Sequence, residues 1–354
     1  MRLFCVAMFW AVPELLLSAS EPAAVDALSL EETDAALEAI WRRTPVPAQR
    51  SPDSAKRAAL EAYLKRLGPG TGLSSGPPEE LTEAEFPPLK FYSELLPGKL
   101  AYIRMGRLQA ELVPRMESEL RDFAQLGARH LILDLRATPS GGTLADAAGL
   151  AGCFIGEGSP IFAMRTSEGT GAPLLGTRAP TARLRVLLLT GPRTAGPVEA
   201  FAAALRVRAG ASVLGSPTRG EAADFEVVPL QNGRALRLPT RLAVVPEIPG
   251  LFPKGLQPDV PCHVSREAGD AALQQAAGDG RVAPLLVETE RPRLNEAALV
   301  AGRNPEMELW IQNQLQKKQG VAPAPAPVRD EALRLAVDFL TALDALDARP
   351  VALP

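Results

Sequence analysis

The chain has 354 residues, of which 46% are hydrophobic and 22% are charged, and its net charge at pH 7 is only −3. This length allows one large or two moderate globular domains, and the composition is ordinary for such domains. The small net charge, the scattered Lys and Arg residues and the aromatic content of 5% exclude a basic or base-stacking surface for nucleic acid.

The N-terminus is typical of an export signal, which we assign to residues 1–20. Arg2 precedes a mostly apolar run at residues 3–17, and the small residues Ser-Ala-Ser follow it as a cleavage site. This run is too short to span a bilayer. We therefore expect an exported protein, periplasmic or secreted, with an uncleaved anchor and a cytoplasmic protein as the alternatives.

Two cysteines, Cys153 and Cys262, remain once such a signal is removed. An oxidising compartment would allow them to form a disulfide, but we favour two separate buried thiols, which behave as small hydrophobic side chains. Two cysteines and two histidines at these spacings match no zinc site. We expect neither a metal nor any other cofactor.

A small helical region, residues 21–67, follows the signal. Ser29 and Glu32 form a capping box that opens a helix through Trp41. A second helix opens at Ser51-Pro52 and stops at Gly68. The next residues are rich in Gly, Pro and Ser, so we assign residues 68–94 to a linker.

Strand and helix patterns alternate in the predicted core, residues 95–264. The predicted strands are 99–105, 131–135 and 185–189, and the predicted helices are 111–126, 144–154 and 198–208. The strand 131–135 (LILDL) has the pattern of a parallel strand covered on both faces. The alternation predicts an α/β fold with a mostly parallel sheet. Residues 225–230 and 235–238 flank Asn232-Gly233, which predicts a β-hairpin.

Beyond Val264 the chain loses strand character, so the core is expected to carry helical N- and C-terminal extensions. We assign residues 265–320 to a helical extension and residues 321–329 to a Pro/Ala linker. Asp330 caps a final helix, residues 330–354, whose apolar stripe docks on a core or on a partner helix.

Asp134 and Arg136 stand at the end of the apolar strand 131–135. A charge buried at such a place must be paired or hydrogen-bonded. We therefore predict that both residues matter for folding rather than for chemistry. The two histidines, His130 and His263, are interpreted as structural or surface residues.

Two stretches of the core have the pattern of a serine peptidase. A buried strand leads into the turn TAGPVE (194–199) and an Ala-rich helix, and the sequence TRGE (218–221) follows. They resemble the carboxyl-terminal processing, or tail-specific, proteases, in which such a turn carries the nucleophilic serine and a later Gly-Lys pair carries the lysine base. The sequences GKLAYIR (98–104), PSGG (139–142) and KGLQPDV (254–260) match further motifs of that family.

The resemblance spans roughly Lys99 to Val260 and implies a tail-specific-protease-like (ClpP/crotonase-like) core. Members of the family often carry a peptide-binding PDZ domain ahead of the catalytic core. We find no room for one between the linker and Lys99, so we expect no PDZ domain.

The resemblance places the nucleophile at Gly196 and the base at Glu221. A Ser/Lys dyad needs a hydroxyl group and an amine that can be neutral near physiological pH. Glycine offers no nucleophile, and no lysine occurs between Lys99 and Lys254. We therefore expect no catalytic residue, and interpret the chain as a pseudoenzyme with the fold of a serine peptidase.

The features that remain favour binding. Gly196 and Pro197 open a helix, so they offer backbone N–H groups and a positive dipole end to a peptide carboxylate. We expect the binding residues to be Gly141, Gly142, Thr194 and Gly196. The expected partner is a peptide or an envelope protein, not nucleic acid or a small-molecule cofactor, and the oligomeric state stays open.

Two other functions stay open. The first is an active serine-type endopeptidase in which Thr194 or Ser140 is a relocated nucleophile and Glu221 is its base. The second is a structural envelope protein whose terminal helices make the contacts.

Overall fold

The computed structural model describes residues 29–43, 52–74, 89–279, 281–286 and 328–347, with isolated positions between 304 and 311. The predicted signal at residues 1–20 and nearly all of the linker predicted at residues 321–329 lie outside the described residues. The chain divides into two units, residues 1–63 and 64–354, and each is described by itself.

The first unit contains α1 (Leu30–Arg43) and most of α2 (Pro52–Leu67). The predicted capping box is present at α1, because the Ser29 N–H donates to Glu32 Oε2 (2.7 Å) and the Glu32 N–H donates to Ser29 Oγ (3.1 Å). The helix α2 begins with its proline, as predicted, and ends before Gly68. The φ of 115° at Gly68 is one that residues with a side chain rarely adopt.

The second unit is built around a six-stranded sheet with the strand order β11-β8-β7-β4-β3-β2. Its strands are β2 (Tyr92–Leu96), β3 (Leu100–Arg104), β4 (His130–Asp134), β7 (Arg185–Thr190), β8 (Ser212–Gly215) and β11 (Val260–Pro261). Neighbouring strands pair in parallel from β3 to β11, and β2 pairs with β3 in the antiparallel sense. The prediction of an α/β fold with a mostly parallel sheet is confirmed.

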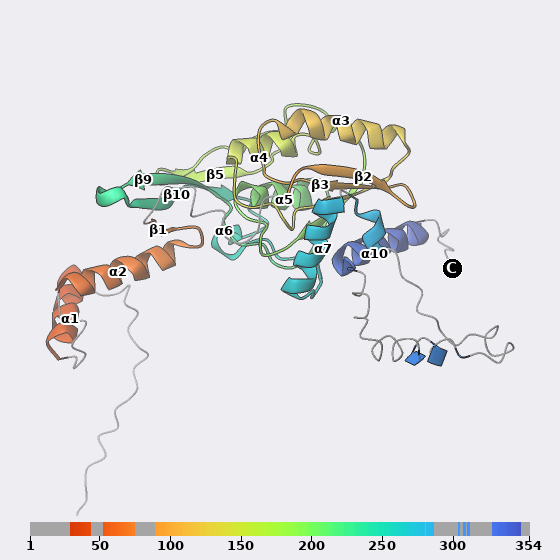
Figure 1. Cartoon of the computed structure of the whole chain (residues 1–354). Coiled ribbons are helices and arrows are strands. Elements are labelled where there is room, and N and C mark those ends of the chain that lie inside the picture. Colours follow the sequence, from red (N-terminus) through yellow and green to blue (C-terminus); the bar gives the residue numbers. More distant parts are fainter. Residues whose placement is uncertain are drawn as a thin grey trace, which may run out of the picture. The chain divides into compact units, whose positions relative to one another are not determined.

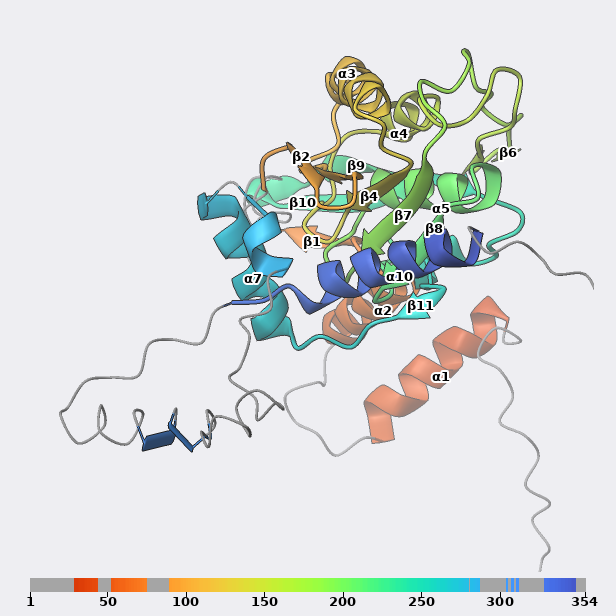
Figure 2. The same ribbon diagram turned by 90° about the vertical axis from the view of Figure 1, so that its right-hand side faces the viewer.

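Successive residues of the central strands belong to two hydrophobic cores. Leu131 and Leu133 of β4 pack in one core, and Ile132 packs in the other, as the alternation of side chains along a strand requires. The first core is covered by α3 (Leu112–Gln125), α4 (Leu144–Ala151) and α5 (Pro197–Arg208). The second is covered by α7 (Arg266–Asp279) and α10 (Glu331–Asp347). Figures 1 and 2 show α3 and α4 on one side of the sheet and α10 on the other.

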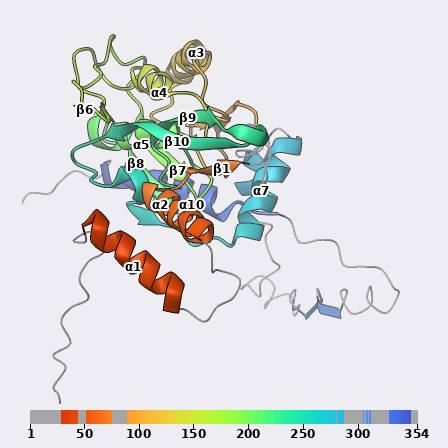
Figure 3. The same ribbon diagram turned by 90° about the vertical axis from the view of Figure 1, so that its left-hand side faces the viewer.

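A smaller antiparallel sheet stands beside the first. Its strands are β1 (Gly72–Ser74), β5 (Ala163–Thr166), β6 (Gly169–Thr170), β9 (Ala223–Pro229) and β10 (Ala235–Val244). The strands β9 and β10 form the predicted hairpin, and Figure 3 shows β1 alongside them. Asn232 and Gly233 hold the turn with φ values of 60° and 69°, and the Arg234 N–H donates to the Gln231 carbonyl oxygen (3.4 Å).

The structure corrects the linker predicted at residues 68–94. β1 lies within this range and pairs with β10, and β2 begins at Tyr92, ahead of the predicted start of the core at residue 95. β1 was not predicted because Gly-Leu-Ser has the composition of a linker and joins the sheet through backbone pairing. Strands β5, β6, β8 and β11 were not predicted either, since each has only two to four residues.

Other predictions concern short ranges. α4 ends at Ala151 rather than at Phe154. Cys153 and Cys262 are separate free thiols, as we favoured, but only Cys153 is buried and Cys262 is partly exposed. The helical extension predicted at residues 265–320 is described only in part, as α7 and a 3-10 turn at Ala283–Leu286. Across the described ranges, every helix falls short of the length and apolar character needed to cross a bilayer.

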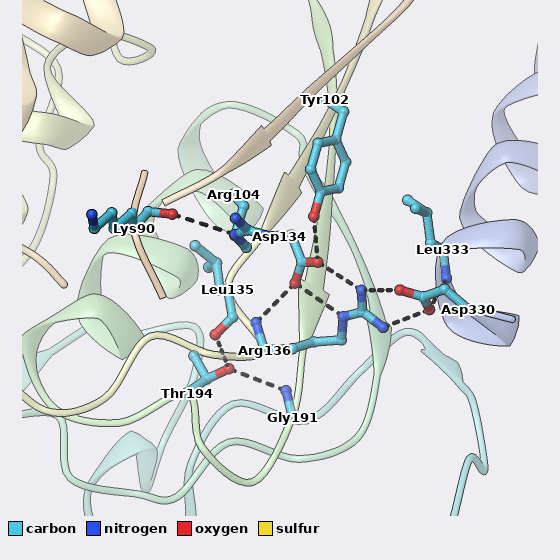
Figure 4. A network of polar contacts seen from close by, with 10 residues as sticks. All are labelled: Lys90, Tyr102, Arg104, Asp134, Leu135, Arg136, Gly191, Thr194, Asp330 and Leu333. Atoms are coloured by element: carbon cyan, nitrogen blue, oxygen red, sulfur yellow. Dashed lines mark hydrogen bonds and ion pairs between the residues drawn. The ribbon is translucent and has the colours of Figure 1, made fainter. Parts of the chain in front are cut away.

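A buried ionic network joins the end of β4 to the start of α10 (Figure 4). The Asp134 carboxylate accepts hydrogen bonds from the Arg136 guanidinium (2.6 and 3.0 Å) and from the Tyr102 hydroxyl (2.9 Å). The same guanidinium donates two bonds of 2.7 Å to Asp330, which caps α10 by accepting the Leu333 N–H (2.9 Å). Asp134 and Arg136 are therefore hydrogen-bonded, as predicted for charges at this place, and the network extends to Asp330, 194 positions beyond Arg136.

The two ends of β4 both hold α10. Burial alone would raise the pKa of the Asp134 carboxyl, but the charge and hydrogen bonds of Arg136 outweigh burial and lower that pKa. At the other end of the strand, His130 Nε2 lies 2.7 Å from Asp344 Oδ1, and this hydrogen bond lowers the pKa of Asp344. His130 thus has a structural position, as we predicted.

We expect Asp134→Ala to lower the free energy of unfolding by about 3–5 kcal/mol, because it removes one partner of a buried ion pair. Asp338→Ala is the control, since Asp338 forms an exposed pair with Arg334 (3.7 Å). Its expected cost is at most about 1 kcal/mol. Urea denaturation of the two variants measures both values, and equal losses would contradict the role of the buried network.

Candidate functional site

Three loops meet at one edge of the six-stranded sheet. They follow β4, β7 and β8 and span residues 135–143, 191–196 and 216–222. The carboxyl ends of adjacent parallel strands lie at the same edge of a sheet, where α/β proteins bind their ligands. The fold therefore brings together Ser140, Gly196 and Glu221, one from each loop.

Gly196 stands in a position that has no room for a side chain. It is buried, and its φ of 82° lies in the left-handed region that favours glycine. A Cβ atom added to it would lie 2.6 Å from Ser140 Oγ and 3.0 Å from Ser140 Cα. Ser140 therefore occupies the space into which a nucleophile at position 196 would project.

Glu199 links the loops of the site through hydrogen bonds to its buried carboxylate. Its buried carboxylate accepts hydrogen bonds from the N–H groups of Gly196 (3.0 Å), Gly220 (2.7 Å) and Glu221 (2.7 Å) and from the Thr218 hydroxyl. Burial raises the pKa of this carboxyl to about 7, and the donated hydrogen bonds oppose that rise. One side chain thus links the two positions that a Ser/Lys dyad would occupy.

This geometry changes the binding site that the sequence predicts. The Gly196 N–H donates to Glu199, so it is not available to a peptide carboxylate, and Pro197 carries no N–H. Thr194 is fully buried; its hydroxyl donates to the Leu135 carbonyl oxygen (2.8 Å) and accepts the Gly191 N–H (3.1 Å). These partners give Thr194 a structural role in the scaffold.

The remaining predicted residues, Gly141 and Gly142, lie on the turn that leads into α4. A Cβ at Gly141 would lie 3.0 Å from Arg107 Cγ, and a Cβ at Gly142 would lie 2.8 Å from the Leu108 carbonyl oxygen. Gly142 is exposed and has a φ of 66°. Of this turn, Ser140 is the residue that contacts Gly196.

A cavity of about 260 Å³ adjoins this contact. It is lined by Gly70, Thr71, Gly72, Ser140, Arg219, Glu221 and Arg237. Arg219 Nη1 lies 3.7 Å from Glu221 Oε1, so the residue in the place of the base is paired with a cation. The residues that line the cavity thus carry two guanidinium groups, one carboxylate and two hydroxyls.

Arg237 is the residue of this cavity that the sequence did not indicate. Its guanidinium lies 3.6 Å from the centre of the Phe225 ring and donates to the Gly70 carbonyl oxygen and to Ser140 Oγ (3.5 Å). Burial lowers its pKa, and the charge of Glu221 opposes that shift. From the sequence, an arginine in a hairpin strand is expected to face solvent. No sequence pattern therefore indicates that Arg237 belongs to a site.

Comparisons with known proteins agree with the motifs. The family model described as peptidase family S41 matches residues 99–262. The "Carboxy-terminal processing protease CtpA" of Bacillus subtilis is 22% identical over 169 residues, which are 48% of this chain and 36% of that protein. A "Probable CtpA-like serine protease" of Staphylococcus epidermidis is 25% identical over 167 residues, or 46% of this chain and 33% of that protein.

Among solved structures, the photosystem II D1 C-terminal processing protease is similar, with 19% identity and a TM-score of 0.44 over 57% of this chain and 55% of that one. The chain spans about a third of the length of the curated relatives that it matches. The resemblance read from the motifs is confirmed for the core.

We expect Gly196→Ala to lower the free energy of unfolding through two effects, the clash with Ser140 and the strained φ. Overpacking in a close-packed site costs about 1–3 kcal/mol, and a side chain in the left-handed region costs a further 1–3 kcal/mol or so. Adding Ser140→Gly to the same chain is expected to recover the first part and not the second. A double-mutant cycle by urea denaturation measures this recovery, and strictly additive effects would contradict the contact.

The raised pKa of Glu199 predicts how stability changes with pH. Between about pH 4.5 and about pH 7 the unfolded chain loses the Glu199 proton while the folded chain keeps it, so this residue's contribution to stability falls as pH rises. The expected fall is on the order of 3 kcal/mol, and it is complete above about pH 7. Denaturation curves of wild type and Glu199→Gln across this range check the sign, since parallel profiles would refute it.

Proposed function

Because the model of peptidase family S41 matches residues 99–262 of this chain, we propose that it is a catalytically inactive member of that family which binds polypeptides without cleaving them. The observation that carries the proposal is the contact between Gly196 and Ser140. A nucleophile in the family's position would need the space that Ser140 Oγ fills, 2.6 Å from an added Cβ. Acyl transfer by a side chain at this position is therefore blocked.

The lysine base of the family is missing as well. Glu221 takes the place of the lysine, and it is held by Arg219 and by the hydrogen bond from its own N–H to Glu199. Ser140 could act as a nucleophile only with a base beside it. Its hydrogen-bond partner is Arg237, and a guanidinium stays protonated in proteins and cannot accept the hydroxyl proton.

The binding part of the proposal rests on the cavity beside Ser140. Arginine forks recognise carboxylates with two parallel hydrogen bonds. A bound carboxylate would replace Glu221 as the partner of Arg219 and the Gly70 carbonyl oxygen as the partner of Arg237, and the Ser140 hydroxyl adds a further donor. One curated relative is named for processing at carboxyl termini. A chain with a similar core and without the dyad would keep recognition of a peptide's carboxyl end while losing the cleavage step.

We further propose that the protein is exported. The apolar stretch with a preceding arginine at residues 1–20 supports a periplasmic or secreted protein. The partner would then be a peptide or an envelope protein whose carboxyl terminus is free. A purely structural envelope protein would bind no such terminus.

The test uses the purified full chain with two versions of one unstructured peptide, which differ in a free or an amidated carboxyl terminus. We expect the free form to bind at least tenfold more tightly by calorimetry, a difference of about 1.4 kcal/mol. Arg237→Gln is expected to remove this preference. Arg165→Gln is the matched control, because Arg165 lies on β5 and donates to Thr170 instead.

Three results would overturn the proposal. No binding of either peptide form would favour the structural alternative, and equal affinities would contradict recognition of the carboxyl terminus. Hydrolysis of the peptide that Ser140→Ala abolishes would show an active endopeptidase with a relocated nucleophile.

A further inference from the structure

The segment 68–74, which we call the strap, forms one wall of the cavity beside Ser140. Its residues Gly70, Thr71 and Gly72 line that cavity together with Glu221 and Arg237. The strap follows α2 and belongs to the same unit as the core. A piece of the chain that the sequence assigns to a linker therefore lies over the position where the family has its base.

The strap approaches the site so closely that one of its residues must be glycine. A Cβ at Gly70 would lie 2.6 Å from Arg237 Nη1, 2.8 Å from Phe225 Cζ and 3.0 Å from Glu221 Cδ. Gly70 has a φ of 77°, and its carbonyl oxygen accepts a hydrogen bond from Arg237. Its backbone thus rests on the arginine and the aromatic ring with no side chain between them.

Beyond Gly70 the strap becomes a strand of the smaller sheet. β1 pairs with β10 in the antiparallel sense, with Gly72 opposite Arg237, Leu73 opposite Leu236 and Ser74 opposite Ala235. The opposite edge of this part of β10 is taken by β9. The strap therefore fills the free edge of β10 in the way that a bound peptide fills the edge of a sheet.

Apart from this backbone pairing and the contacts of Gly70 with Arg237 and Phe225, few side-chain contacts hold β1 in place. Leu73 is 46% exposed, and a Cβ at Gly72 would have no atom within 4 Å. The buried Thr71 hydroxyl oxygen has no hydrogen-bond partner among the described residues. A segment that buries few apolar side chains opens at low free-energy cost compared with the core of a domain.

We propose that the edge of β10 at Ala235–Arg237 is a strand-addition site, which the strap fills from within the chain and which an extended polypeptide fills after displacing it. The inference rests on the proposed polypeptide-binding function and adds a site and a sequence requirement to it. The partner must carry a glycine where its backbone crosses Arg237 and Phe225, followed by an extended segment. The strap's own sequence, GPGTGLS, is the model for such a partner.

The experiment compares wild type with Gly70→Val, whose side chain would collide with Arg237 and Phe225 and expel the strap. The probe is a peptide with the sequence of residues 67–75, acetylated and amidated so that it has no terminal charge. We expect it to bind Gly70→Val at least tenfold more tightly than wild type. We also expect hydrogen exchange of residues 235–237 in the variant to become faster and to slow again when the peptide is added.

Gly210→Val is the matched control for backbone strain. Gly210 has a φ of 67°, and no atom lies within 4 Å of an added Cβ, so this change strains the chain without touching the strap. It is expected to bind the peptide like wild type. A peptide with valine in place of the glycine that corresponds to Gly70 is expected to bind no form of the protein. If circular dichroism shows Gly70→Val to be unfolded, Gly70→Ala takes its place in the same comparison.

Equal affinity of the peptide for wild type and the variant, or no binding to either, would overturn this inference. Because the probe has no free carboxylate, its failure is separate from failure of the carboxylate preference expected for Arg219 and Arg237. A protein that binds free carboxyl termini but ignores the capped peptide would keep the proposed function and lose the strand-addition site.

Discussion

The Arg136 guanidinium is the point at which the sheet and the C-terminal helix depend on each other. A positive charge in this position has left water almost completely, and it is compatible with folding only because carboxylates stand on both sides of it. Asp134 comes from the strand that carries it, whereas Asp330 comes from the far end of the chain. The central strand can bury its charged end only when α10 is docked, so the second hydrophobic core and the ionic network form together.

The same physical rule governs the site at the carboxyl ends of the strands. Glu199 is buried, and its oxygens are satisfied by the backbone of three loop residues and by one hydroxyl. These bonds place the loops where a serine peptidase would place its nucleophile and its base, yet the bonds themselves involve neither. A peptidase scaffold can therefore be held in its shape by groups that take no part in chemistry, and Ser140 can close the remaining space.

Much of the fold could be predicted from the sequence because its signals are local. The apolar run LILDL, the Asn-Gly turn and the capping residues Ser29 and Asp330 each dictate structure within a few positions. The strap could not be predicted from local signals. Its composition is that of a linker, and it forms a strand only by pairing with β10, whose position relative to the strap the sequence does not reveal. The sequence likewise indicated that the charges of Asp134 and Arg136 must be paired or hydrogen-bonded, but it could not show that Asp330 is one of the partners.

The site was predicted less completely than the fold, for a related reason. The motifs located Gly196 and Glu221, but their spacing says nothing about which side chain enters the vacant space or which N–H groups are already used. Thr194 and Gly196 were expected to bind a ligand. The Thr194 hydroxyl and the Gly196 N–H instead form hydrogen bonds within the scaffold. Arg237 became part of the cavity only through the packing of the hairpin over the loops.

The two anchors of α10 define its register on β4. Asp330 and Asp344 are about 21 Å apart along a helix that rises 1.5 Å per residue. Their partners flank β4, because His130 begins the strand and Arg136 lies in the turn just after the strand ends at Asp134. The two pairings together require the helix to run antiparallel to the strand. Inserting a single residue into α10 would turn one anchor about 100° around the helix axis. The spacing of Asp330 and Asp344 thus determines which face of α10 packs on the sheet.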